Sequence, residues 1–315
     1  MKDYFKIKNF IKASAGYVLF LLLIFYILRF TNFDWHVLRS ISAGYFWVLS
    51  FISVIFLVQN GIGLKLIVGF FKSKIGFIEA FHLSQFFDLL NYLPFKAGMI
   101  ALGAHLKRNH NLPMNKYAAG TILVYTLNSI IYFIVGGWLV YFYNFSAIFR
   151  VVSPLYLSLF IGAVFAFALL YFFLPEFKKD NRYFRYFNFL FQHRGDLVES
   201  KKYIFFSALL SLTVLFISAL RIDILLKILN YHTPFYVSLM LAVLAGFSFI
   251  VAFTPGNLVV REAFLGGLTY LLIGNANIGI VISMFMRVFD LFWLLIFGSY
   301  SFFKLKSKIS ANFTD

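Results

Sequence analysis

The chain has 315 residues, of which 62% are hydrophobic, 22% are aromatic and only 13% are charged, with a formal net charge of +16. Several apolar runs approach the length that crosses the roughly 30 Å hydrocarbon core of a bilayer, which excludes an ordinary soluble fold. The basic residues lie at the ends of these runs rather than in one patch, so anionic lipid headgroups are the expected partners and nucleic acid is not.

The sequence gives no indication of a metal or another cofactor. It contains no cysteine, which excludes disulfides and thiolate metal sites. Its six histidines show no spacing typical of a zinc protease or another ligand set. We therefore expect neither a metal nor a cofactor.

The first apolar run, residues 13–29, follows a basic N-terminus and is itself followed by polar residues. A cleaved signal peptide would instead end in small residues, so this run predicts a retained membrane helix. Further full spans are expected at 41–59, 116–142, 154–174, 203–226 and 278–303. We expect an all-α, polytopic integral membrane helix bundle in which residues 1–315 form one domain.

Two other apolar regions are interrupted by proline. Region 75–107 is broken at Pro94, and region 234–275 is broken at Pro255-Gly256, so each predicts two half-length helices. Each region is either a re-entrant hairpin or a pair of short, tilted spans. In both alternatives the region begins and ends on the same side of the membrane. The two regions then have opposite orientations, an arrangement by which many transporters build a site near the membrane midplane.

The distribution of basic residues predicts the topology. Most of the 28 Lys and Arg residues lie in five groups: Lys2 to Lys12, Lys65 to Lys74, Lys107 to Lys116, Lys178 to Lys202, and Lys304 to Lys308. Because cytoplasmic loops carry an excess of Lys and Arg, these groups and both termini are expected on the cytoplasmic side of the inner membrane.

A polar stripe leads into the first broken region. Ser84, Asp88 and Asn91 fall on one face of a helix directly before Pro94 and Lys96. Such side chains can simply hydrogen-bond to neighbouring membrane helices. The stripe, the break and the lysine together indicate a binding site.

The second broken region contains the sequence TPGNLVVRE, residues 254–262. Asn257 can cap the helix that follows the break, and Arg261 lies one turn into that helix, so the free N–H groups and the guanidinium form a plausible seat for an anion. A plain helix kink is the alternative. Glu262 diverges from Arg261 by about 100° on the helix, so each side chain must find a partner elsewhere.

Two charged pairs and one single arginine lie in the last two long spans. Arg287 and Asp290 are three residues apart on one helix face and can neutralise each other or contribute to a site. Asp223 and Lys227 have favourable i, i+4 spacing, and Arg221 is expected to extend toward the membrane surface. The predicted headgroup-binding residues are Asp88, Lys96, Asn257, Arg261, Glu262, Arg287 and Asp290, with no catalytic residue assigned.

The chain resembles the transmembrane flippase domain of lysylphosphatidylglycerol synthetases, also called multiple peptide resistance factors, over about residues 75–303. The segment TPGNLVVREAFL keeps Pro255, Gly256, Arg261 and Glu262 of the family's Pro-Gly-Gly-x-Gly-x-Arg-Glu element, with Asn257 and Val259 in place of two glycines. The segment LPFKAGMIALGAHLKR is similar to a second family element, and FMRVFDLFWLLIFG keeps the arginine of the final helix.

The resemblance also shows departures. Met99 and Leu102 stand where the family often has Glu and Arg, and Tyr125, Thr126 and Asn128 replace residues that are often charged. The resemblance implies movement of an anionic, aminoacylated or glycosylated lipid between leaflets. The soluble aminoacyl-transfer domain does not follow the membrane part in this sequence, so synthesis of a lysyl lipid is not expected.

Three functions remain open from the sequence: a lipid flippase, a membrane glycosyl or acyl transferase, and an accessory scaffold for a lipid-modifying enzyme. A transferase needs a carboxylate pair or a histidine base near an aqueous opening, and Asp88 with His82 is the one candidate. Translocation rather than covalent chemistry is therefore the favoured activity. The sequence does not indicate an oligomeric state.

Overall fold

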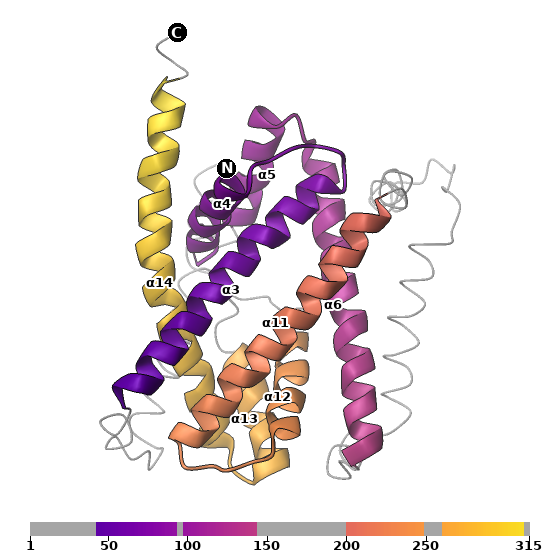
Figure 1. Cartoon of the computed structure of the whole chain (residues 1–315), viewed down its shortest axis with the longest axis vertical. Coiled ribbons are helices and arrows are strands. Elements are labelled where there is room, and N and C mark those ends of the chain that lie inside the picture. Colours follow the sequence, from indigo (N-terminus) through magenta and orange to yellow (C-terminus); the bar gives the residue numbers. More distant parts are fainter. Residues whose placement is uncertain (1–41, 93–96, 144–199, 249–259, 312–315) are drawn as a thin grey trace, which may run out of the picture.

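The computed structural model describes residues 42–92, 97–143, 200–248 and 260–311 (Figure 1). Within these ranges the chain forms α-helices and no β-strand. In chain order the helices are α3 (Ala43–Gly69), α4 (Phe77–Leu90), α5 (Ala97–Asn109), α6 (Met114–Tyr143), α11 (Lys201–Ile228), α12 (Phe235–Phe247), α13 (Val260–Ile273) and α14 (Ala276–Ala311).

Four of these helices are long and apolar enough to cross a membrane. They cover Ala43–Gly69, Met114–Phe142, Lys201–Ile228 and Ala276–Leu305, which confirms four of the predicted spans and the polytopic all-α fold. The other two predicted spans, 13–29 and 154–174, lie outside the described residues.

The remaining helices α4, α5, α12 and α13 have 13 or 14 residues each. At about 1.5 Å per residue, each is about 20 Å long and too short to cross the hydrocarbon core. In Figure 1, α4 and α5 lie at one end of the bundle, and α12 and α13 lie at the other. Both proline-broken regions are therefore pairs of half-length helices, and they have opposite orientations.

The described helices form two repeats of the same pattern: a long helix, two half-length helices and a long helix. The first repeat comprises α3 to α6 and the second comprises α11 to α14. In Figure 1 the chain runs upward in α3 and downward in α11, and downward in α6 and upward in α14. The second repeat is thus inverted with respect to the first.

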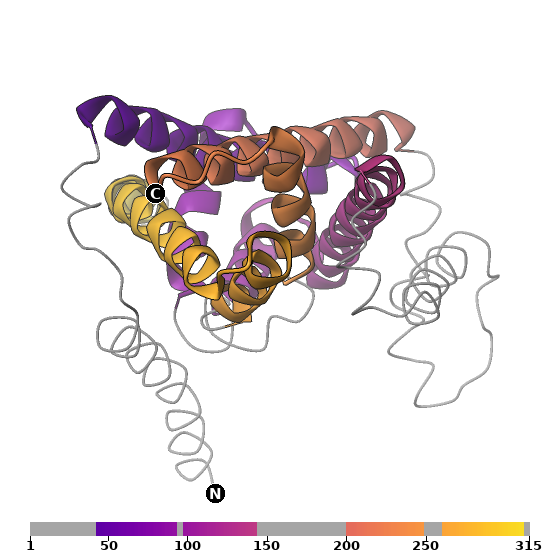
Figure 2. The same ribbon diagram turned by 90° about the horizontal axis from the view of Figure 1, so that it is seen from below.

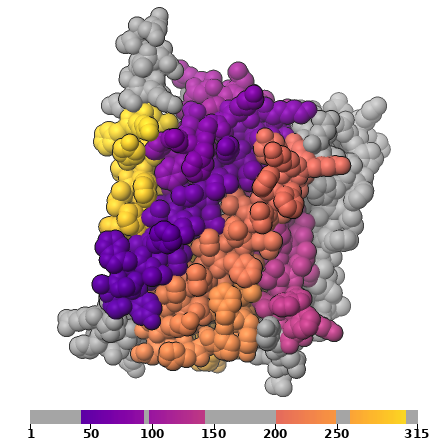
Figure 3. Space-filling model, in the orientation of Figure 1, coloured from indigo at the N-terminus to yellow at the C-terminus, as the bar shows by residue number. Residues whose placement is uncertain are grey.

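Helix contacts follow the same symmetry. Helix α4 packs against α3, α5 and α14, and its counterpart α12 packs against α11, α13 and α6. Contacts of α3 with α6 and α14 correspond to contacts of α11 with α14 and α6, and α3 packs directly against α11. Figures 2 and 3 show α3 and α11 side by side along one face of the molecule.

The turns between helices repeat as well. The described residues with positive φ are Lys72, Asn111, Asn230 and Gly274. Lys72 and Asn230 follow the first long helix of each repeat, and Asn111 and Gly274 precede the last. A residue in the left-handed conformation commonly ends a helix. Equivalent turns of the two repeats therefore share this backbone conformation.

Helix α3 is longer than predicted, because it continues from the expected end at Gln59 to Gly69. Gly61 and Gly63 look like a helix end in the sequence. In the structure, a Cβ at Gly61 would lie 2.9 Å from the Cα of Phe81 on α4. The glycine therefore permits close helix packing and does not end the helix.

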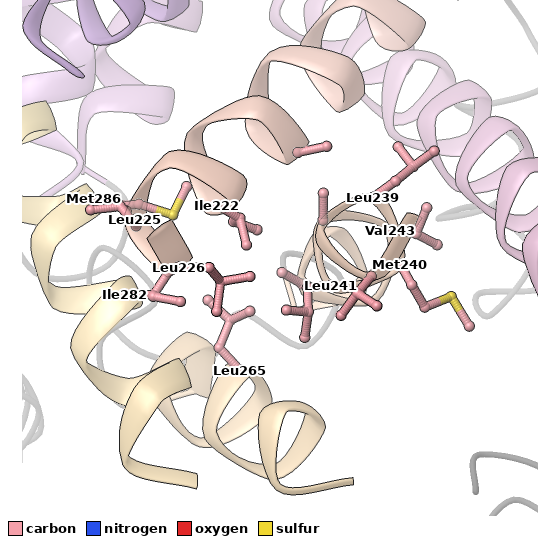
Figure 4. Close-up of a cluster of buried hydrophobic side chains, with 14 of the residues drawn as sticks. Ile222, Leu225, Leu226, Leu239, Met240, Leu241, Val243, Leu265, Ile282 and Met286 are labelled. Carbon is pink, nitrogen blue, oxygen red and sulfur yellow. The ribbon is translucent and has the colours of Figure 1, made fainter. Parts of the chain in front are cut away.

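Two apolar clusters stabilise the bundle, one in each repeat. The first is built mainly from α11, α12, α13 and α14, where Ile222, Leu226, Leu241 and Ile282 are each at most 1% exposed (Figure 4). The second joins α3, α4, α5 and α6. These clusters hold the half-length helices of each repeat against their long neighbours.

Candidate functional site

A cavity of about 900 Å³ lies between the two half-length hairpins. All the described helices contribute to its lining, from α3 and α4 in the first repeat to α13 and α14 in the second. Its volume is at the upper end of the range for small-molecule sites. The charged residues that line it are Asp88, Arg221, Arg261, Arg287 and Asp290.

Arg261 lies in the first turn of α13 and faces this cavity. Its Nη2 contacts the sulfur of Met286 at 3.2 Å, and among the described residues no carboxylate oxygen lies within 4 Å of its guanidinium. A thioether is only a weak acceptor. Among the described residues, most of the guanidinium's hydrogen-bonding capacity is therefore unused.

Glu262, the next residue, turns away from the cavity and is 0% exposed. It accepts hydrogen bonds from the Nε of Arg287, from the Nη2 of Arg287 at 3.3 Å and from Ser283 Oγ at 3.0 Å. The expectation that Glu262 finds a partner away from Arg261 holds, whereas Arg261 has only the Met286 sulfur among the described residues. Glu262 joins α13 to α14 and holds the Arg287 side chain at the cavity wall.

Arg221 forms the second buried ion pair at the cavity. Its Nη1 lies 2.7 Å from an oxygen of Asp290, and its Nη2 donates to the backbone carbonyl of Met286. Arg221 is only 3% exposed, so the prediction that it extends to the membrane surface is wrong. Arg287 and Asp290 also do not pair with each other. Arg287 pairs with Glu262 on α13, and Asp290 pairs with Arg221 on α11.

Asp88 lines the cavity from α4, in the first repeat. Its two oxygens accept hydrogen bonds from Asn60 Nδ2 at 3.0 Å and from Asn91 Nδ2 at 3.4 Å. Asn91 in turn accepts from the backbone N–H of Met99 at 2.9 Å. The predicted stripe of Ser84, Asp88 and Asn91 thus lines the cavity, as expected from its spacing.

Several predicted features fall outside the described residues. They are Lys96 and Asn257, together with the breaks at Pro94 and Pro255-Gly256. Their roles, and the predicted close approach of the two breaks, stay predictions. Asp223 and Lys227 form the expected pair at 2.7 Å, away from the cavity-lining residues.

Sequence reasoning missed a polar wall formed by long helices. Gln59 donates to Thr213 Oγ1 at 3.2 Å, which joins α3 to α11, and Ser211 donates to Asn128, which joins α11 to α6. Within the described ranges, three buried polar atoms along the cavity have no hydrogen-bond partner: Gln59 Oε1, Ser207 Oγ and Arg221 Nε. In the sequence, the polar pair Gln59-Asn60 within an apolar run could have indicated this polar wall.

The candidate transferase pair is not brought together in one space. The Nδ1 of His82 lies 2.9 Å from Ser301 Oγ on α14, and His82 is not among the residues that line the cavity. Asp88 does line it. Among the described residues, no cluster of three or more His, Asp or Glu side chains is placed to hold a metal.

A comparison with protein-family models finds one described as the lysylphosphatidylglycerol synthase TM region, which matches residues 13–301. Searches of curated proteins and of solved structures find no match. The family match includes both repeats and all the described residues that line the cavity.

Proposed function

Because this chain belongs to the family of the lysylphosphatidylglycerol synthase TM region, we propose that it is a flippase. In this proposal it moves an anionic, aminoacylated or glycosylated lipid between the two leaflets. The headgroup passes through the cavity between the half-length hairpins, and the acyl chains stay in the surrounding hydrocarbon. The chain is a multi-pass membrane protein, and the family connects it with membrane lipids.

The observation that carries the proposal is the charge arrangement at the cavity. Arg287 is neutralised by Glu262 and Arg221 by Asp290, whereas Arg261 contacts only a sulfur among the described residues. One guanidinium at the start of a half-length helix is thus left to bind a phosphate or another headgroup anion. A charge placed inside a membrane without a partner is costly, which supports a functional role.

The helix arrangement supports transport rather than static binding. Inverted repeats with half-length helices place a site near the membrane midplane, where a ligand can be reached from either leaflet. Buried polar atoms of Gln59, Ser207 and Arg221, which have no partner in the part of the chain that the structure describes, extend this polar lining along the long helices. A headgroup that enters can hydrogen-bond to atoms that otherwise remain unsatisfied.

The proposal includes a location in the inner membrane, with both termini in the cytoplasm. The helix ends near the top of Figure 1 belong to α3, α5, α6, α11 and α14. These ends carry Lys65, Lys107, Arg108, Lys116, Lys201, Lys202 and Lys304. At the opposite end the described residues include Lys227 as a basic side chain. The excess supports a cytoplasmic position for the top end.

Replacement of Arg261 tests the proposal. In Arg261→Gln, leaflet exchange of fluorescent phosphatidylglycerol in proteoliposomes should fall about tenfold or more, because a charge-assisted hydrogen bond contributes roughly 1.5–3 kcal/mol. Arg261→Lys should recover part of the rate, since a point charge does not reproduce the guanidinium fork. Arg108→Gln, a matched change at an exposed residue of α5, is the control and should exchange lipid normally.

Thermal stability of each variant is measured in the same preparations. A loss of exchange that matches a loss of folded protein would show that Arg261 is structural. Normal exchange in a stable Arg261→Gln protein would remove this residue from the mechanism. A wild-type protein that moves no lipid would refute the flippase proposal itself.

A further inference from the structure

Asp88 connects three helices through one chain of hydrogen bonds. Asn60 of α3 donates to one carboxylate oxygen at 3.0 Å, and Asn91 at the end of α4 donates to the other at 3.4 Å. The carbonyl oxygen of Asn91 accepts from the backbone N–H of Met99 on α5 at 2.9 Å. The state of the Asp88 carboxylate therefore affects how the first hairpin is attached to its long neighbour.

The partners of Asp88 are neutral amides. Among the described residues no Lys, Arg or His nitrogen lies within 4 Å of its oxygens. An intramembrane carboxylate without a cation can take up a proton far more readily than one in an ion pair. Asp88 also lines the cavity, so a proton from water in the cavity can reach it.

The second hairpin provides an internal comparison. Its carboxylate, Glu262, is enclosed by Arg287 and Ser283 and does not line the cavity. Protonation of Glu262 would leave the Arg287 guanidinium buried without its counter-ion. Of the two carboxylates Asp88 on α4 and Glu262 on α13, only Asp88 is thus placed to change its charge.

The groups that face Asp88 from the neighbouring elements do not neutralise it directly. The α3 and α5 sides present the Asn60 amide and, through Asn91, the Met99 backbone. The titratable groups close enough to interact with Asp88 are the hydroxyls of Tyr92, Tyr117 and Tyr125. The Tyr92 hydroxyl also interacts with the charges of Arg261, Arg287 and Asp290. Of these, Arg287 and Asp290 are already paired with other residues.

We propose that Asp88 takes up and releases one proton in each transport cycle, so that lipid movement is coupled to a proton gradient. This inference rests on the proposed flippase function. When a proton from water binds one Asp88 oxygen, that oxygen becomes a hydroxyl, which donates a hydrogen bond and no longer attracts an amide N–H by charge. When the proton binds the oxygen that faces Asn60, the link between α4 and α3 weakens, and the hairpin is freed to move relative to α3.

The test uses the full chain in vesicles that contain fluorescent phosphatidylglycerol, with potassium and valinomycin on both sides and a pH indicator inside. At one proton per lipid, a gradient of about one pH unit should shift the leaflet ratio of the probe by up to about tenfold relative to equal pH. The indicator should report proton movement that depends on the protein. Protein-free vesicles give the passive background.

Asp88→Asn should still exchange probe lipid, at a reduced rate, but its leaflet ratio should not respond to the gradient. Asp88→Glu keeps a titratable group and should retain the response, which provides a second variant if Asp88→Asn folds poorly. Asp223→Asn removes a carboxylate that pairs with Lys227 away from the cavity lining, and its response should equal that of the wild type.

Four results would overturn the inference. A wild-type protein that exchanges lipid without any response to the gradient would refute proton coupling and leave the flippase proposal intact. A gradient response that persists in Asp88→Asn would show that another group carries the proton. Complete loss of exchange in a folded Asp88→Asn protein would show that the carboxylate binds the headgroup instead. Absence of exchange in the wild type would refute both proposals.

Discussion

At the scale of single residues, three arginines line one cavity and have three different environments. Arg287 is held by Glu262, Arg221 is held by Asp290, and Arg261 contacts the sulfur of Met286. The sequence predicts that Arg261 and Glu262 point in different directions, since that follows from helix geometry alone. It cannot predict which partner Arg287 takes, because local spacing favours Asp290 whereas tertiary packing brings Glu262 within reach.

The Glu262–Arg287 pair should be important for stability. Glu262→Gln leaves a buried guanidinium without its counter-ion, so the free energy of unfolding should fall by about 3 kcal/mol or more. The double variant Glu262→Gln with Arg287→Gln should regain part of this loss, because no buried charge then remains unpaired. Thermal unfolding in detergent measures both effects.

A second ion pair, whose lysine is exposed, serves as the control. Lys227 is 47% exposed, so its pair with Asp223 should contribute less than about 1 kcal/mol. Asp223→Asn should therefore lower the Tm much less than Glu262→Gln does. Equal losses for the two variants would contradict the assignment of Glu262–Arg287 as the dominant buried pair.

At the scale of elements, the half-length helices depend on very close backbone contacts. A Cβ at Gly98 of α5 would lie 1.8 Å from the carbonyl oxygen of Phe87 on α4. A Cβ at Gly279 of α14 would lie 2.1 Å from the carbonyl oxygen of Leu265 on α13. The prolines in the sequence predict where each region breaks, but these contacts between paired helices follow only from the fold.

Alanine substitutions separate packing from helix propensity. Gly279→Ala should lower the Tm and the yield of folded protein, because the contact with backbone atoms leaves no space for a methyl group. Gly267→Ala, within α13, meets no atom within 4 Å and should be neutral or stabilising by up to about 1 kcal/mol. A Gly279→Ala protein as stable as the Gly267→Ala protein would contradict the close approach of α13 and α14.

At the scale of the whole molecule, the two inverted repeats determine where each turn lies. The sequence predicts the opposite orientation of the two broken regions well, because apolar length acts over whole segments. It predicts the repeat itself poorly, since the two halves share a helix pattern and turn geometry while their site residues differ, as Asp88 and Arg261 do. The pairing of α4 with α14 and α12 with α6 likewise required the structure.

Single cysteines can be introduced into a chain that contains none. Lys74→Cys and His110→Cys lie in turns beside the first hairpin, and His232→Cys and Asn275→Cys lie in turns beside the second. An impermeant thiol reagent should label the first two from one side of the membrane and the last two from the other. Labelling of all four from the same side would contradict the inverted arrangement.

The two equivalent hairpin contacts are built alike but packed differently. Where α14 meets α4, a Cβ at Gly298 would lie 3.1 Å from Leu89 Cδ2 and 3.2 Å from the carbonyl oxygen of Gln85, so a side chain and the backbone both border it. Where α6 meets α12, the ring of Tyr132 fills the space beside Gly246. The proposed flippase function would use this difference: exchange of the two packings between the halves would reverse which leaflet the cavity faces. The free-energy cost of this proposed conformational change would then be the difference between two similar helix contacts, because one contact forms as the other is lost.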